Sequence, residues 1–236
     1  MTAVVVEAEK DFKQKHLISN NIANSCKLVT DLREGVSIYN FHYAKPPVTV
    51  PMNFHLKKII GDNETGFNGI EDATYRTEAW DFILAGGSLF NHLDYSFTTD
   101  NEEGSYKIES GQPGGGGKTL RNQFKILAEF MQTIDYVNMV PVNNDRLRLP
   151  LPDSTGVQAL AKADEVFAIY LHSKDTTKVR SVIEINLPEG SYNLTWVDTK
   201  SASESVENLK DHHGGWARIS SPVYTEDIAL KVIKTN

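Results

Sequence analysis

Short apolar segments alternate with helix-compatible segments over the first 140 residues, and this alternation most constrains the fold. Strands are expected at 16–19, 36–41, 58–62 and 88–90. Residues 75–85 and 118–135 carry apolar positions at helical spacing, and a charged segment at 7–15 is also compatible with a helix. Strands separated by helices favour parallel βα units over hairpins.

The sequence pattern changes in the remainder of the chain, where short strand-like segments and turn residues follow one another closely. We expect strands at 157–160, 165–171, 179–185, 191–197, 217–220 and 228–233, with turns at 188–190 and 213–215. This spacing is typical of an antiparallel β-sandwich. A polar, proline-marked stretch at 141–145 predicts a boundary, giving domains at 1–140 and 141–236.

Composition narrows the classes of partner. A formal net charge of −7 argues against a nucleic-acid backbone, and no apolar run approaches the roughly 20 residues of a membrane span. Cys26 is the single cysteine, so neither an internal disulfide nor a cysteine-built metal site is possible. His212 and His213 beside a glycine pair favour a solvated turn over a metal site. We expect no metal and no cofactor.

Polar side chains follow each strand of the first region. They are amides, an imidazole and carboxylates, at Asn20, Asn21, Asn40, His42, Asp62, Glu64, Asn91 and Asp94. The carboxyl ends of parallel strands meet at one edge, where barrel enzymes gather their active groups. Such groups pair with hydroxyls, and aromatic faces at Tyr43, Phe67 and Tyr95 lie beside them. The recurrence predicts a sugar site, although each residue alone also fits a capping role.

The third strand carries the most informative alternation. Ile60, Asp62 and Glu64 are spaced to face one side, and Gly61 and Asn63 are spaced to face the other. An apolar residue followed by two carboxylates suits a strand that leaves a packed core and enters a polar pocket.

Four segments, 40–47, 61–67, 75–82 and 85–87, resemble the second half of an apiosidase-like glycoside hydrolase barrel. The later part resembles the β-sandwich appended to such barrels, which is labelled as collagen-binding. The resemblance implies an α/β plus all-β chain: a partial (β/α) TIM-type barrel, about strands 5 to 8, followed by an antiparallel β-sandwich. It also implies a secreted or periplasmic full-length protein.

The same resemblance assigns roles to particular residues. Glu64 matches the nucleophile at the end of barrel strand seven. Residues 100–117, after the fourth strand, form an acidic, glycine-rich loop. Arg76 matches an arginine that would anchor this acidic loop. The polar and aromatic groups at the strand ends, independently of the resemblance, give the candidate carbohydrate-binding residues: Asn20, Asn40, His42, Tyr43, Asp62, Asn91 and Asp94.

The chain departs from the family pattern in its number of strands. A barrel needs eight strands, and retaining hydrolysis needs a second carboxyl about 5 Å from the first. We find no candidate for the general acid in this chain, because Asp62, two positions from Glu64, is spaced for a positioning role.

Three interpretations therefore stay open. The chain is a glycosidase part completed by a second copy or another chain, an inactive carbohydrate-binding or structural descendant, or a fragment with no independent role. Exposed strand edges predict a homo-oligomer.

Overall fold

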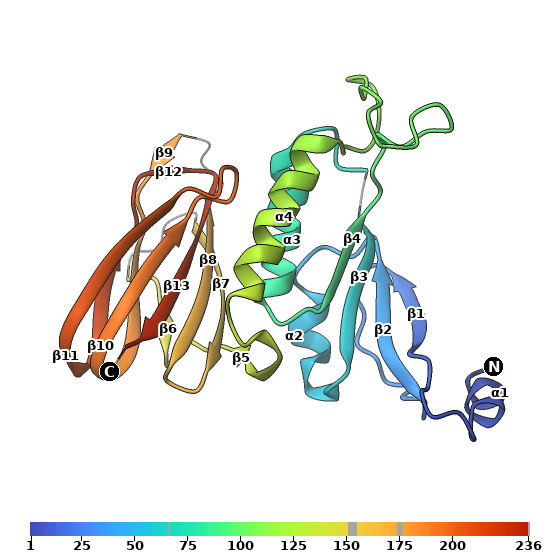
Figure 1. Cartoon of the computed structure of the whole chain (residues 1–236), viewed down its shortest axis with the longest axis horizontal. Helices are drawn as coiled ribbons and strands as arrows, with labels where there is room; N and C mark the ends of the chain where they lie inside the picture. Colours follow the sequence, from blue (N-terminus) through green and yellow to red (C-terminus); the bar gives the residue numbers. More distant parts are fainter. Residues whose placement is uncertain (66, 151–154, 174–176, 236) are drawn as a thin grey trace.

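A parallel four-stranded sheet forms the first half of the computed structural model, which describes residues 1–65, 67–150, 155–173 and 177–235. The sheet order follows the sequence: β1 (Ile18–Asn24), β2 (Val36–His42), β3 (Ile59–Thr65) and β4 (Leu89–His92). Every pairing in it is parallel. The expected parallel strands are confirmed, with β1 displaced toward the C-terminal side of the expected segment (Figure 1).

Helices cover one face of this sheet. They are α2 (Thr49–Asn53), the 3-10 helix η1 (Phe54–Leu56), α3 (Asp72–Leu84) and α4 (Lys118–Gln132), and η2 (Tyr136–Asn138) follows α4. The prediction of a helix at 7–15 is wrong. Helix α1 (Thr2–Ala8) lies earlier in the chain and overlaps the expected segment only at residues 7 and 8. No described helix is long and apolar enough to cross a membrane.

The second half is an antiparallel sheet ordered β11-β10-β13-β8-β7-β5, with β6 paired to β10 and a separate β9–β12 pair. The strands are β5 (Val140–Pro141), β6 (Leu147–Arg148), β7 (Thr155–Lys162), β8 (Val166–Ser173), β9 (Lys178–Val179), β10 (Val182–Val197), β11 (Glu204–Ser220), β12 (Tyr224–Thr225) and β13 (Asp227–Lys234).

The turns expected at 188–190 and 213–215 are wrong, because both segments lie inside long strands. Glu189 of β10 pairs with His213 of β11, and the register shifts between Gly190 and Tyr192. Positive φ angles at Gly190, Gly214 and Gly215 accompany this bulge and let the strands continue through it. The first half of β10 pairs with β6 and the second half with β13, so the sheet curls around its own core.

Helices α3 and α4 lie between the two sheets and share a core with the antiparallel one (Figure 1). Trp80 of α3 stacks on Tyr170 of β8, with ring centroids 5.4 Å apart and planes at 14°. Phe82, on the same helix, packs instead against Phe90 of the parallel sheet. Helix α3 therefore buries residues on two faces, where the spacing of its apolar residues predicts one.

Candidate functional site

Glu64 lies at the C-terminal end of β3, in a bulge that breaks the expected alternation. Its φ angle is +78°, and the pairing of β3 with β4 shifts register between Asn63 and Thr65. Asp62 is fully buried, whereas the Glu64 side chain is 32% exposed. The expectation that Ile60, Asp62 and Glu64 share one face is wrong, because the bulge turns Glu64 away from the other two.

Two side chains, at the end of β2 and just after it, hold the Glu64 carboxylate. Nδ1 of His42 lies 3.0 Å from Oε2 of Glu64. The Tyr43 hydroxyl donates a hydrogen bond to the same carboxylate. Desolvation raises the pKa of Tyr43, and the hydrogen bond to Glu64 and its negative charge raise it further. The sequence-predicted residues His42, Tyr43 and Glu64 thus form one contact group.

Amide side chains line the same sheet. The Asn40 Nδ2 donates to Ser19 Oγ at 3.1 Å, and the Asn91 Nδ2 donates to Asn63 Oδ1 at 3.1 Å. Asn40 is 6% exposed and lies beside Gly61, where a Cβ atom would come within 1.9 Å of its Oδ1. The absence of a side chain at Gly61 therefore makes room for the Asn40 amide.

Asn20 lies apart from this group. With Asn21 it lines a separate hollow of about 210 Å³, together with residues 27–31 and Arg33. Asn20 pairs in register with Tyr39, a fully buried residue of the helix-covered face. Side chains of residues paired in register lie on the same face of a sheet, so Asn20 is directed away from the face that carries Asn40.

Asp62 belongs to an acidic pair behind the strand end, in which Asp62 is fully buried and Glu78 is half-buried. Burial raises the pKa of Asp62 to about 8, and the nearby Glu78 carboxylate adds to the shift, against a smaller opposing effect of the Ala44 backbone N–H. Burial likewise raises the pKa of Glu78 to about 7, opposed by a hydrogen bond from Thr65. Sequence reasoning missed Glu78, because the helical pattern of α3 gives no sign that this carboxyl is buried.

Asp94 is held by its own hydrogen-bonding partners. It pairs with Arg121 at 2.7 Å and accepts hydrogen bonds from Ser96 and the Gly117 backbone N–H. Burial acts to raise its pKa, but the hydrogen bonds from Ser96 and Arg121 outweigh that effect, so the pKa lies below its usual value. Asp94 therefore serves as a fixed anchor at the base of the acidic loop.

The arginine that anchors the acidic loop is Arg121, so the expectation for Arg76 is wrong. Arg121 also donates to Ser96 Oγ at 2.9 Å and Gly104 O at 2.8 Å, and its guanidinium lies 4.9 Å from the Phe97 ring centroid. Arg76 points to the other side of α3, where it is 1% exposed and bonded to the antiparallel sheet.

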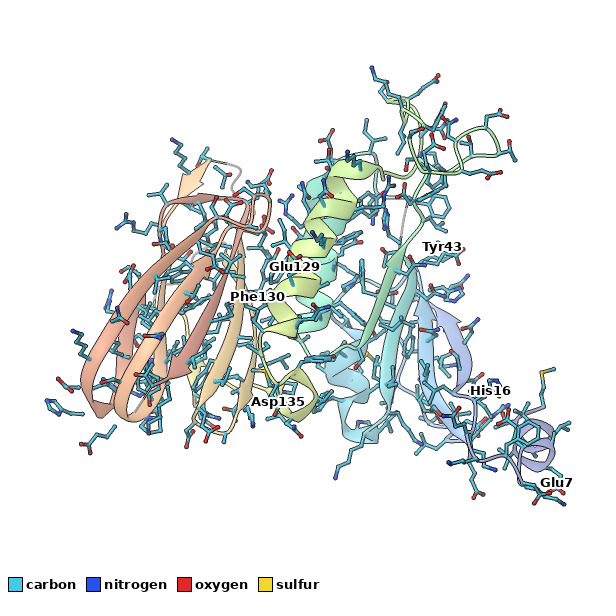
Figure 2. All side chains as sticks on the ribbon, in the orientation of Figure 1. Glu7, His16, Tyr43, Glu129, Phe130 and Asp135 are labelled. Carbon is cyan, nitrogen blue, oxygen red and sulfur yellow. The ribbon has the colours of Figure 1, made fainter. Side chains whose placement is uncertain are left out.

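An aromatic line extends from Glu64 toward the acidic loop. The ring centroids of Tyr43 and Phe67 are 5.4 Å apart, and those of Phe67 and Tyr95 are 6.3 Å apart. Tyr43 is 39% exposed and Phe67 is 51% exposed, so both offer ring surface to a ligand. Figure 2 places Tyr43 at the end of the parallel sheet from which this loop projects.

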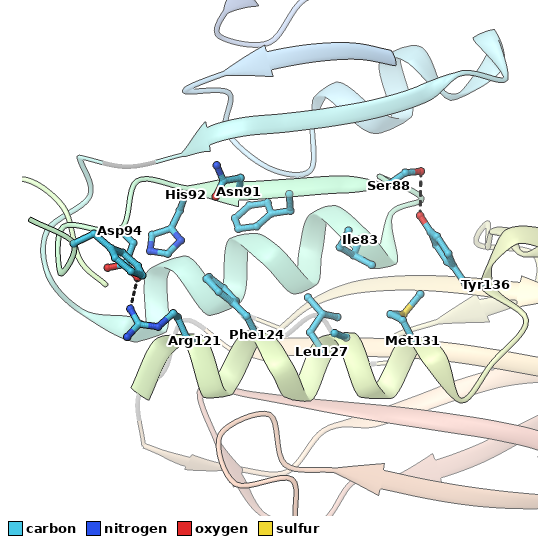
Figure 3. Close-up of a pocket in the computed structure, with 13 residues that line it drawn as sticks. Ile83, Ser88, Asn91, His92, Asp94, Arg121, Phe124, Leu127, Met131 and Tyr136 are labelled. Carbon is cyan, nitrogen blue, oxygen red and sulfur yellow. Dashed lines mark hydrogen bonds and ion pairs between the residues drawn. The ribbon is translucent and has the colours of Figure 1, made fainter. Parts of the chain in front are cut away.

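A second feature is an apolar hollow of about 480 Å³ between β4 and α4 (Figure 3). The Asp94–Arg121 pair closes one end, and most of the wall is apolar, formed by Phe90, Phe124, Leu127 and Met131. Such a lining offers few partners for hydroxyl groups. Among the described residues, no group of three or more His, Cys, Asp or Glu side chains is placed to hold a metal ion.

No protein-family model matches this sequence, and no curated protein matches it. The fold matches several solved glycoside hydrolases. A family 5 glycoside hydrolase from Bacteroides vulgatus has a TM-score of 0.66 at 13% identity, over 98% of this chain and 58% of that chain. A noncanonic maltogenic alpha-amylase from Thermotoga neapolitana has a TM-score of 0.56 at 10% identity, over 100% of this chain and 59% of that chain.

A family 30 subfamily 8 xylanase from Clostridium acetobutylicum has a TM-score of 0.52 at 15% identity, over 86% of this chain and 49% of that chain. The chain therefore has a glycoside hydrolase-like fold, and it spans 49 to 59% of the length of these three structures.

Proposed function

We propose that this chain is the C-terminal part of a carbohydrate-acting glycoside hydrolase with Glu64 as its nucleophile. The single observation that carries the proposal is the contact group of Glu64, His42 and Tyr43 at the C-terminal end of a parallel sheet. In the proposed architecture, β1 to β4 are strands 5 to 8 of an apiosidase-like (β/α) barrel within residues 1–140. Residues 141–236 are then the appended β-sandwich domain.

The geometry around Glu64 suits nucleophilic attack. A nucleophilic carboxylate must be ionised, oriented and accessible, and donors on one side leave lone pairs free on the other. The Tyr43 hydroxyl supplies such a donor, and Nδ1 of His42 lies 3.0 Å from the same carboxylate. The bulge at Glu64 presents its side chain outward from the strand end. In the first step, a Glu64 oxygen bonds the anomeric carbon while the glycosidic bond breaks, and water then hydrolyses the resulting ester.

The binding roles divide according to the contacts. Asn91 is proposed to hydrogen-bond sugar hydroxyls, with Tyr43 and Phe67 providing apolar faces. Asn40 and His42 are proposed to position the site, because Asn40 Oδ1 and His42 Nε2 are buried and their other polar atoms contact Ser19 and Glu64. The two aspartates are proposed to position the site, Asp62 through the pair with Glu78 and Asp94 through the ion pair with Arg121. Asn20 is not included, because it lines the separate hollow beside residues 27–31.

The leaving group also needs a proton, which a second carboxyl supplies in retaining enzymes. In the described part of the chain, the side chains in contact with Glu64 are an imidazole and a phenol. Asp62 lies buried behind the sheet, and Asp94 is paired with Arg121. We therefore place the general acid outside this chain, in a second copy or another segment, which makes β1 and β4 the edges where assembly occurs.

A second candidate function follows from the same observation. Without the acid, the chain would hold sugar on the amide and aromatic groups without cleaving it. Turnover and binding distinguish these functions. Calorimetric titration with oligosaccharide pools detects binding, and release of nitrophenol from aryl glycosides detects cleavage.

The test of the proposal is Glu64→Gln, with Glu129→Gln as the matched control on the exposed surface of α4. We expect Glu64→Gln to abolish aryl-glycoside cleavage with an unchanged circular dichroism spectrum and melting temperature, and Glu129→Gln to retain activity. Cleavage that persists in Glu64→Gln would remove Glu64 from the mechanism. Heat of binding without cleavage in the unaltered chain would favour the second function.

A further inference from the structure

A third hollow opens within the acidic loop that joins β4 to α4. Its volume is about 490 Å³, and most of its wall is formed by Asp94, Tyr95, Phe97, Thr98, Tyr106 and Gln112. We call it the loop hollow. In Figure 1 this loop projects from the end of the parallel sheet. The volume lies within the roughly 300–1,000 Å³ of small-molecule sites.

Contacts within the loop itself hold the wall of the loop hollow in place. The Tyr106 backbone N–H donates to Ser96 O at 3.1 Å, and the Tyr95 N–H donates to Gly115 O at 3.1 Å. Gly114 packs so tightly on the Tyr95 ring that a Cβ atom there would come within 2.4 Å of it. Together with the hydrogen bonds of Arg121, these contacts hold the loop in one arrangement.

The chemistry of the wall suits a sugar ring. Tyr95 and Tyr106 offer aromatic surface for the apolar face of a pyranose. Thr98 and Gln112 offer a hydroxyl and an amide to its hydroxyl groups. A wall that combines ring surface with a few neutral polar groups is therefore matched to a neutral carbohydrate.

The charge around the loop hollow favours a neutral ligand over an acidic one. The carboxylate in the wall, Asp94, is already paired with Arg121. Four further carboxylates follow along the same loop, at Asp100, Glu102, Glu103 and Glu109. Their negative charge disfavours anionic sugars.

Aromatic side chains link the wall of the loop hollow to Glu64. Tyr95 belongs both to its wall and to the line of rings through Phe67 to Tyr43, which contacts Glu64. We propose that the loop hollow is a distal subsite for a neutral oligosaccharide, which extends from it along these rings to Glu64. The direction of the oligosaccharide toward Glu64 rests on the proposed function, and the subsite itself rests on the loop hollow.

The test is a binding series on the whole chain with neutral cello-, xylo- and malto-oligosaccharides of one to six sugars. We expect affinity in at least one series to rise with length and then level off. Tyr106→Ala should weaken binding of the longest members about five- to tenfold and leave the monosaccharide unaffected. Tyr106→Phe, which keeps the ring, should retain most of the affinity.

Trp216→Ala is the matched control, because Trp216 is an exposed aromatic residue (38%) on the antiparallel sheet. Equal affinity at every length, no binding in any series, or equal losses in Tyr106→Ala and Trp216→Ala would each overturn the subsite. Glu64→Gln separates the two proposals. Binding that depends on Tyr106 in this variant supports the subsite, whether or not Glu64 proves to be the nucleophile.

Discussion

Arg76 of α3 and Asp227 of β13 form a buried ion pair that joins the helix layer to the antiparallel sheet. Nε of Arg76 lies 3.1 and 3.0 Å from the two Asp227 carboxylate oxygens, and Nη2 lies 2.7 Å from Oδ1. Glu226 accepts a further hydrogen bond from Arg76, and Tyr170 donates one to Asp227. Burial opposes the charge of Arg76, but these acidic partners raise its pKa above the usual value.

Removing one partner of this pair should destabilise the whole chain. Arg76→Met leaves Asp227 as an uncompensated buried charge, and we expect a loss of about 3–5 kcal/mol in the free energy of unfolding. Urea denaturation checks this value. Lys125→Ala is the control, because the Lys125–Glu129 pair is exposed and should contribute less than about 1 kcal/mol. Similar losses in the two variants would contradict a structural role for the Arg76 pair.

The raised pKa of Asp62 makes stability depend on pH. The folded chain keeps a proton that the unfolded chain releases above the ordinary aspartate pKa of 3.8, so this group lowers stability progressively from about pH 4 to its folded pKa of about 8. Asp62→Asn removes the linkage and should flatten the decline by at most about 1.4 kcal/mol per pH unit. The difference between the unfolding free energies of the two proteins, measured at steps from pH 4 to 8, checks this. A constant difference would show that Asp62 is ionised in the folded chain.

A side chain at Gly61 should destabilise the fold. In Gly61→Ala the added methyl group would lie 1.9 Å from Asn40 Oδ1 and 3.3 Å from Leu89, so Asn40 must move and its bond to Ser19 is disturbed. We expect a loss of about 1–3 kcal/mol in the free energy of unfolding. Gly111→Ala is the matched control, because a Cβ atom there would meet nothing within 4 Å. A melting temperature as high in Gly61→Ala as in Gly111→Ala would contradict this packing.

Arg121 should control the order of the acidic loop with little effect on the remainder of the fold. Arg121→Met removes its bonds to Asp94, Ser96 and Gly104, and we expect amide hydrogen exchange to accelerate over residues 94–106. Exchange in β8 and β13 should change far less. Unchanged exchange in the loop would show that its other contacts suffice to hold it.

The parallel sheet and the contact group around Glu64 could be predicted in outline from the sequence. Strand–helix alternation indicated β1 to β4, and the polar residues at the C-terminal ends of β2 and β3 indicated His42, Tyr43 and Glu64. The direction of the Glu64 side chain could not be predicted. The alternation of side chains along a regular strand does not include a bulge, and Glu64 lies in one with a φ of +78°.

Contacts between residues far apart in the sequence could not be predicted from local sequence patterns either. Arg76 and Asp227 lie 151 positions apart, and no local pattern links them. The bends at Gly190 and Gly214 have the composition of turns, and only pairing between β10 and β11 shows that the strands continue.

Covalent trapping tests the role of Glu64 most directly, even though its general acid is placed outside this chain. A 2-deoxy-2-fluoroglycosyl fluoride carries a leaving group that departs without protonation, so a competent nucleophile is labelled when the acid is absent. The chain would be incubated with a panel of such sugars, digested and sequenced by mass spectrometry. The expected result is a single fluoroglycosyl ester on Glu64 that is absent from Glu64→Gln. A label on another carboxyl, or no label with any sugar of the panel, would contradict Glu64 as the nucleophile.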